Sequence, residues 1–240
     1  ALSGQYTIWC AAIMVLIVST ILFTNLKKGA PAQVTKKGSY FSTLAIAFRE
    51  AKNPRVALAY TAGVVSRGDL SVVSTFFSLW LFNEAISMVM SRAEAFKLST
   101  GFYVMVQAFA IPGAVLINFF IDKVDRVMAL AIAMGIAAVG YLYLGFIDDI
   151  FSPQMYFGAA LLGLGEIFAN ISAISLIGSA APAKGRGAVI GGFSFFGAIG
   201  ILLVASIGGW LFDNVGPTAP FTMVGFANLG LLILALVLLF

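Results

Sequence analysis

Residues 121–147 read IDKVDRVMALAIAMGIAAVGYLYLGFI, a short charged segment followed by 21 residues that carry no charge. A helix needs roughly 20 apolar residues to cross a bilayer core about 30 Å thick, and residues 127–147 meet that length. Transmembrane barrel strands are about ten residues long and alternate polar with apolar side chains, which this run does not do. The stretch therefore predicts a transmembrane helix that begins just after a charged loop.

Six further apolar runs lie on either side of this one. They cover Tyr6–Leu26, Val56–Asn83, Leu98–Ile121, Gln154–Gly178, Ala188–Phe212 and Ala219–Phe240. The 240-residue chain is 61% hydrophobic and only 10% charged, whereas a soluble domain is about one quarter charged. We expect an all-α, polytopic transmembrane bundle: one helix in residues 1–26, a loop at 27–55 and six helices in 56–240.

The segments that connect the runs alternate in charge. Residues 27–55, 122–126 and 179–187 together hold 11 Lys or Arg, while 84–97, 148–153 and 213–218 hold 2. Cytoplasmic loops carry the excess of basic residues, so the first set faces the cytoplasm. The predicted topology places Ala1 outside and Phe240 in the cytoplasm.

The long cytoplasmic loop contains an amphipathic pattern. Apolar residues recur in it at helical spacing, and basic residues surround them. The apolar positions are Tyr40, Phe41, Leu44, Phe48 and Ala51, and the basic ones are Lys36, Lys37, Arg49 and Lys52. This pattern favours a helix lying on the inner surface of the lipid bilayer. A solvated basic linker is the alternative.

The composition argues against several kinds of protein. The chain has no histidine and one cysteine, Cys10, so a transition-metal site has no obvious ligands and we expect no cofactor. The basic residues lie in short loops, where they determine topology, and we expect no nucleic-acid partner. The sequence has no P-loop or nucleophile elbow, and we do not expect an enzyme.

The charged loop of the opening stretch carries a recognisable signature. Residues 118–126 read NFFIDKVDR, which resembles the cytoplasmic Gly-x-x-x-Asp-Arg/Lys-x-Gly-Arg motif of the major facilitator superfamily. Asp122, Lys123 and Arg126 match the motif, whereas Asn118 and Asp125 stand where it has glycines. The resemblance implies that Asp122, Lys123 and Arg126 form a gating loop at the inner ends of two helices, where charge-assisted bonds can hold one state. A role in topology alone is the alternative.

The rest of the chain extends this resemblance. The stretches 182–187, PAKGRG, and 208–217, GGWLFDNVGP, look like the flanks of the eleventh helix in many bacterial members. The layout of one helix, a basic loop and six helices is similar to helices six to twelve of a twelve-helix carrier. The resemblance implies a secondary transporter of a small solute in a bacterial inner membrane. It also implies that the first half of the same chain is missing from this sequence.

Three ionisable residues lie inside the predicted spans: Arg67, Asp69 and Glu166. Such residues are costly in a bilayer and mark functional sites by default. At 1.5 Å per residue, Arg67 lies roughly 17 Å from the inner end of its span and Glu166 about 18 Å from the outer end of its own. Both therefore come near the midplane, the depth at which transporters of this kind hold their substrates.

The helical spacing separates Arg67 from Asp69. The two are about 200° apart around a helix and cannot share a face. Arg67 is in register with Ser71 and Ser74, a polar stripe that suits a wet cavity. Asp69 is in register with apolar residues, and its role is open between proton carrier and structural partner.

Further polar residues complete the predicted site. Glu166 is in register with Asn170, and Gln107 on the third run can add a polar group or bridge two helices. In the predicted mechanism, protonation of Glu166 or Asp69 releases Arg67, which then either binds an anionic group of the substrate or changes the gate. An ion pair that only fixes helix packing is the alternative. An uncoupled facilitator, a channel and a seven-helix receptor are the other functions considered.

Overall fold

The computed structural model describes residues 2–25, 40–147 and 149–239. The chain divides into two compact units, residues 1–39 and 40–240, which are considered separately. The first unit contains α1 (Leu2–Asn25), a helix of 24 residues whose apolar stretch is Ala12–Asn25. This helix covers residues 6–25 of the first predicted span, Tyr6–Leu26, and Leu26 lies outside the described residues.

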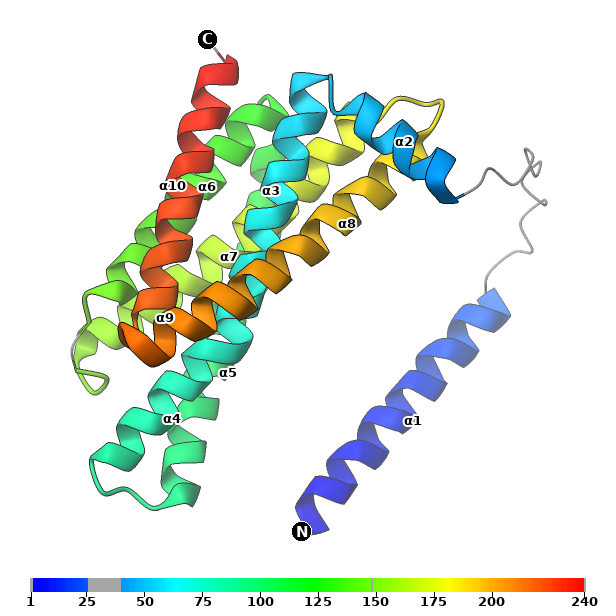
Figure 1. The fold of residues 1–240 in the computed structure, drawn as a ribbon. Coiled ribbons are helices and arrows are strands. Elements are labelled where there is room, and N and C mark those ends of the chain that lie inside the picture. The colour runs from blue at the N-terminus through cyan, green and yellow to red at the C-terminus, as the bar shows by residue number, and fades with distance from the viewer. Residues whose placement is uncertain (1, 26–39, 148, 240) are drawn as a thin grey trace. The chain divides into compact units, whose positions relative to one another are not determined.

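The second unit is a bundle of membrane-length helices (Figure 1). Six helices in the described part of the chain are long and apolar enough to cross a membrane: Pro54–Ser87, Arg92–Ile121, Arg126–Gly145, Pro153–Ala180, Arg186–Asn214 and Ala219–Leu239. They coincide with the six spans predicted from residue 56 onward. The predicted all-α transmembrane fold is thus confirmed.

Figure 1 labels these helices in smaller pieces. The first comprises α3 (Pro54–Ser71), a π-helical segment η1 (Val72–Phe77) and α4 (Ser78–Ser87). Then follow α5 (Arg92–Ile121), α6 (Arg126–Gly145) and α7 (Pro153–Ala180). The fifth comprises α8 (Arg186–Leu203), a π-helical segment η2 (Val204–Gly208) and α9 (Gly209–Asn214), and the last is α10 (Ala219–Leu239).

Local sequence explains where several helices begin. The Asn53 side chain accepts a hydrogen bond from the Arg55 amide, and Pro54 occupies the first position of α3, where its missing N–H costs nothing. Ser91 and Glu94 cap α5 reciprocally. The Asp125 side chain caps α6 by accepting from the Val127 amide at 2.9 Å. These caps mark the charged loops from which the spans leave.

The amphipathic segment also forms a helix, α2 (Tyr40–Glu50). It belongs to the second unit and packs on α8 through the Phe48 ring, which lies 5.7 Å from the Phe196 ring in an edge-on arrangement. The Tyr60 hydroxyl donates to the Ala47 carbonyl at 3.2 Å and ties α2 to α3. Its predicted contact with the lipid surface stays a prediction, and the side chains of Tyr40 and Phe41 lie outside the described residues, as do Lys36 and Lys37.

The two π-helical segments were not predicted. They lie against one another, because the Phe76 ring of η1 is 5.7 Å from the Phe212 ring of α9 and a Cβ added at Gly208 would lie 3.0 Å from the Phe76 ring. Short π-helical insertions occur mostly at functional positions of long helices. Here they occur in the helix that carries Arg67 and Asp69 and in the helix that packs beside it.

Candidate functional site

Asp69 is the most deeply buried carboxyl group in the described bundle, with 0% of its surface exposed. Asn228, on α10, is equally buried and donates through Nδ2 to Asp69 Oδ1 at 2.9 Å. The same amide nitrogen donates to the Val224 carbonyl at 3.0 Å, which fixes its orientation. The second carboxyl oxygen, Asp69 Oδ2, has no hydrogen-bond partner among the residues that the structure describes. The helix contact between α3 and α10 is therefore built around a carboxyl group with one oxygen held and one free.

Glu166 approaches the same region from α7. It is 5% exposed, and its Oε2 is buried with no hydrogen-bond partner among the described residues. The Tyr141 hydroxyl of α6 is likewise buried with no partner in this part of the chain. Because α3, α6, α7 and α10 pack on one another, we refer to Asp69, Asn228, Tyr141 and Glu166 together as the buried polar cluster.

Close helix packing positions Glu166. A Cβ added at Gly163 would meet the Val106 carbonyl of α5, and one at Gly165 would lie 2.7 Å from the Ala137 Cα of α6. Only glycine permits backbones to come this close. The turn of α7 that carries Glu166 is therefore clamped between α5 and α6.

Arg67 lies on another side of α3. It is half-buried, and a Cβ added at Gly197 of α8 would lie 2.8 Å from its Cγ. The Arg67 guanidinium makes no hydrogen bond or ion pair with any described residue. Arg67 thus packs toward α8 and Asp69 toward α10, and no ion pair joins Arg67 to Glu166 among the described residues.

The other predicted site residues are more scattered. Asn170 and Gln107 are half-buried, and Asn170 Oδ1 has no hydrogen-bond partner. Ser74 is exposed and donates to the Ser71 carbonyl at 3.3 Å. Neither serine contacts the buried polar cluster through a described hydrogen bond. Their assignment to a substrate cavity stays a prediction.

The predicted gating loop makes specific contacts. Arg126, the first residue of α6, pairs with the Asp122 carboxylate at 3.3 Å and donates to the Ile121 carbonyl at 2.9 Å. It therefore caps the C-terminal end of α5. Lys123 makes no ion pair with a described residue and its side chain is exposed. Arg126 is therefore the residue of this loop that joins the two helices.

Asp125, which replaces a glycine of the family motif, adds a second connection. Its Oδ1 caps α6, and its Oδ2 pairs with Arg55 at the start of α3 at 3.1 Å. The ends of α3, α5 and α6 that the charge pattern predicts to face the cytoplasm are thus joined by two ion pairs. Both pairs are partly exposed, so each contributes at most about 1 kcal/mol to stability.

These contacts predict a functional rather than a structural effect of Arg126→Ala. We expect the variant to melt close to the parent temperature but to transport several-fold more slowly, because about 1 kcal/mol lost from one gate state changes its population roughly fivefold. Lys123→Ala is the matched control and should transport at nearly the parent rate. Equal losses in the two variants would contradict a gate based on Arg126.

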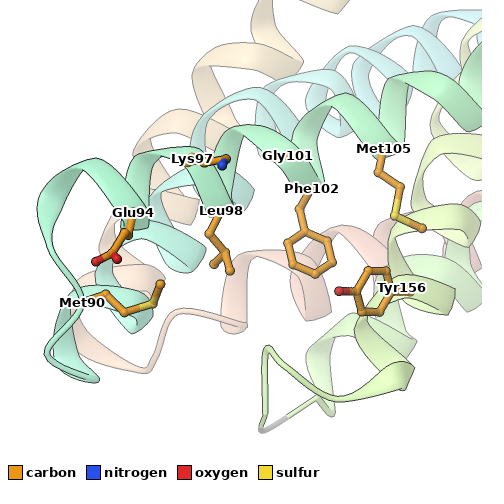
Figure 2. Close-up of a pocket in the computed structure, with 8 residues that line it drawn as sticks. All are labelled: Met90, Glu94, Lys97, Leu98, Gly101, Phe102, Met105 and Tyr156. Atoms are coloured by element: carbon orange, nitrogen blue, oxygen red, sulfur yellow. The ribbon is translucent and has the colours of Figure 1, made fainter.

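A separate cavity of about 450 Å³ lies between the beginnings of α5 and α7. Figure 2 shows Leu98, Phe102 and Met105 projecting from α5, with Tyr156 of α7 facing Phe102. The Phe102 and Tyr156 rings are 5.1 Å apart. The Glu94 carboxylate at its rim is engaged by Ser91. None of the site residues predicted from the sequence lines this cavity.

Sequence reasoning missed three residues of these networks. Asn228 is the one amide within the last apolar run, a signal of the same kind as the buried charges. Tyr141 gave no separate signal because tyrosine is common near membrane surfaces. Arg55 entered the charge count, but its pairing with Asp125 requires the fold.

Comparisons with known proteins extend these observations. The profile of the Major Facilitator Superfamily matches residues 100–240. Magnetosome protein MamH of Paramagnetospirillum magneticum strain AMB-1 is 31% identical over 176 residues, 73% of this chain and 41% of MamH. Magnetosome protein MamZ of the same strain is 26% identical over 92% of this chain and 35% of MamZ. The chain thus spans about two fifths or less of the length of these curated relatives.

One solved structure shares the fold. The proton:xylose symporter XylE, determined with bound 6-bromo-6-deoxy-D-glucose, aligns with a TM-score of 0.54 at 17% sequence identity. The alignment covers 83% of this chain and 45% of the XylE chain.

Proposed function

Because this chain belongs to the major facilitator superfamily, we propose that it forms the C-terminal half of a proton-coupled secondary transporter that works by alternating access. The first half of the site comes from a preceding segment of the same protein. The solute is a small molecule, and the protein lies in a bacterial inner membrane. Because two of its relatives are magnetosome proteins, we include the magnetosome membrane as a second proposed location.

The observation that carries the proposal is the pair of carboxyl groups inside the bundle. Asp69 and Glu166 are both buried, and neither has a cation within ion-pair distance among the described residues. Burying two ionised carboxylates without a cation costs more free energy than the packing of one helix contact contributes. A protein keeps this arrangement when the binding and release of a proton is part of its work.

Arg67 supplies the substrate-binding charge in this proposal. Its guanidinium is half-buried and unpaired within the described bundle, and it lies on the opposite side of α3 from Asp69. A guanidinium presents several donors in a fixed plane, which suits carboxylate or phosphate groups. We infer that the solute, or a group on it, is anionic. Because Arg67 does not pair with Glu166, the proton acts on it through movement of α3 and not by direct release of an ion pair.

The two ends of the bundle fit the same account. Ion pairs join the inner ends of α3, α5 and α6, while the cavity lined by Phe102 and Tyr156 lies at the predicted outer ends of α5 and α7. A closed inner contact and an open outer hollow correspond to an outward-facing half. A channel would need no such alternation.

Counterflow tests the carrier mechanism with the full-length protein in proteoliposomes. Vesicles are loaded with one unlabelled solute from a panel of monosaccharides, carboxylates and inorganic phosphate, and uptake of the same labelled solute is followed. Alternating access predicts that the internal solute accelerates saturable uptake of at least one anionic member. Uptake that rises linearly with concentration and ignores internal solute would indicate a channel and contradict the proposal.

A further inference from the structure

The two carboxyl groups of the buried polar cluster differ in their hydrogen bonds and in their burial. Asn228 holds Asp69 Oδ1 with a 2.9 Å hydrogen bond, whereas no described side chain or backbone group bonds to Glu166 Oε2. Asp69 is 0% exposed and Glu166 is 5% exposed. One carboxyl group is fixed in place at the centre of the helix contact, and the other is held by packing alone.

Within the described part of the chain, no cation pairs with Asp69. A pocket of about 200 Å³ lies beside it, between α3, α8 with η2, and α10, and its other lining residues are all apolar or glycine. The α10 helix has no ionisable residue, and those of α8 and α9 lie at the ends, at Arg186 and Asp213. From α7 comes Glu166 and from α6 comes Tyr141, neither of which is a cation. Arg67, on α3 itself, lies toward α8.

We propose that Asp69 is a resident carboxylic acid that keeps its proton on Oδ2 during transport, and that Glu166 is the carboxyl group that exchanges its proton. Asn228 donates to Asp69 Oδ1, the carbonyl oxygen of this acid, and so directs the proton to Oδ2. A neutral Asp69 lets Glu166 ionise without facing a second negative charge in a medium of low dielectric. The role of the two carboxyl groups in transport rests on the proposed function. Their protonation states do not depend on that function.

Infrared spectroscopy can test this assignment, since a protonated carboxyl group has a carbonyl-stretch band that a carboxylate lacks. The full-length protein is labelled with ¹³C-aspartate in one sample and ¹³C-glutamate in another, and spectra are recorded from acidic to alkaline pH. We expect one aspartate band that persists after the glutamate band has disappeared. Asp69→Asn should remove the aspartate band completely, and Asp213→Asn, at an exposed position, should leave it unchanged.

A second variant tests the hydrogen bond. Asn228→Leu, similar in size, should shift the frequency of the aspartate band without removing it. Because the labelled parent protein already identifies the residue type, the assignment remains testable even if a variant does not fold. An aspartate band that disappears at or before the pH at which the glutamate band does would overturn the proposal. Loss of the band on adding sodium at constant pH would make the cluster a sodium site and overturn it as well.

The two proposals can fail separately. Persistence of the aspartate band together with transport that ignores pH would leave the resident acid standing and remove proton coupling. Proton-driven transport by a protein without the aspartate band would leave coupling standing and remove the resident acid.

Discussion

Glu166→Gln abolishes proton-driven accumulation while exchange of solute across the membrane continues. Glutamine has nearly the same shape as glutamate and fits the same position on α7, directly after Gly165, but it cannot bind or release a proton. We expect the accumulation ratio under an imposed pH gradient to fall to about one, the value of a facilitator with no coupled ion. Accumulation of labelled solute in proteoliposomes of the full-length protein measures this.

A glutamate elsewhere in the bundle provides the control. Glu84, near the C-terminal end of α4, is half-buried but does not belong to the buried polar cluster. Glu84→Gln should accumulate solute like the parent protein. If Glu166→Gln also retained full accumulation with an unchanged dependence on pH, Glu166 would have no part in coupling.

Gly200→Ala destabilises the bundle although alanine is the better helix former. Helix propensity alone favours alanine over glycine by about 1 kcal/mol. A Cβ at Gly200, however, would meet the carbonyl oxygen of Val64 and lie 2.8 Å from its carbon, so α3 and α8 would have to separate. Overpacking of this kind costs about 1–3 kcal/mol, and it acts on backbone that cannot rotate away. We therefore expect a net fall of several degrees in melting temperature in detergent.

Another glycine of the same helix isolates the packing effect. Gly191 is exposed, and no atom outside its immediate neighbourhood lies within 4 Å of an added Cβ. Gly191→Ala should leave the melting temperature unchanged or raise it slightly through helix propensity. Equal destabilisation by both substitutions would mean that α3 and α8 do not pack as described.

The spans were predictable because lipid imposes a simple requirement on sequence. Every backbone polar group in a bilayer must be bonded within its own helix, so a span is a long apolar run and little else. The run 127–147 became α6, Arg126–Gly145, with its start fixed by the cap of Asp125. Ends that lie in charged loops were less certain, and Leu98 was predicted as the start of a helix that begins at Arg92.

The pairing inside the bundle was much less predictable. Helical spacing correctly separated Arg67 from Asp69, but it carries no information about which distant helix each side chain meets. Depth alone suggested that Arg67 lies near Glu166, but no ion pair joins the two among the described residues, and Asp69 bonds to Asn228 of α10. The glycines of α8 also differ in their contacts, since Gly200 packs against α3 and Gly191 does not.

The π-helical segments had no sequence signal at all. η1 and η2 contain mostly apolar residues with a few small polar ones and a glycine. A π-helical turn holds one residue more than an α-helical turn, and a hydropathy pattern of period 3.6 does not reveal this insertion. Their position follows from contacts such as that between Phe76 and Phe212, which join helices far apart in sequence. Such contacts exist only once the bundle has formed.

Proton movement during solute entry is the most direct test of the central claim that this bundle belongs to a proton-coupled carrier. The full-length protein is reconstituted with a pH-sensitive dye trapped inside the vesicles, and a solute that exhibits counterflow is added outside at equal internal and external pH. We predict a change of internal pH that accompanies solute entry. This change should be absent in vesicles without the protein and in vesicles that contain the Glu166→Gln variant. Acidification would indicate symport and alkalinisation antiport. Solute entry with no change of internal pH would contradict the account and leave an uncoupled facilitator.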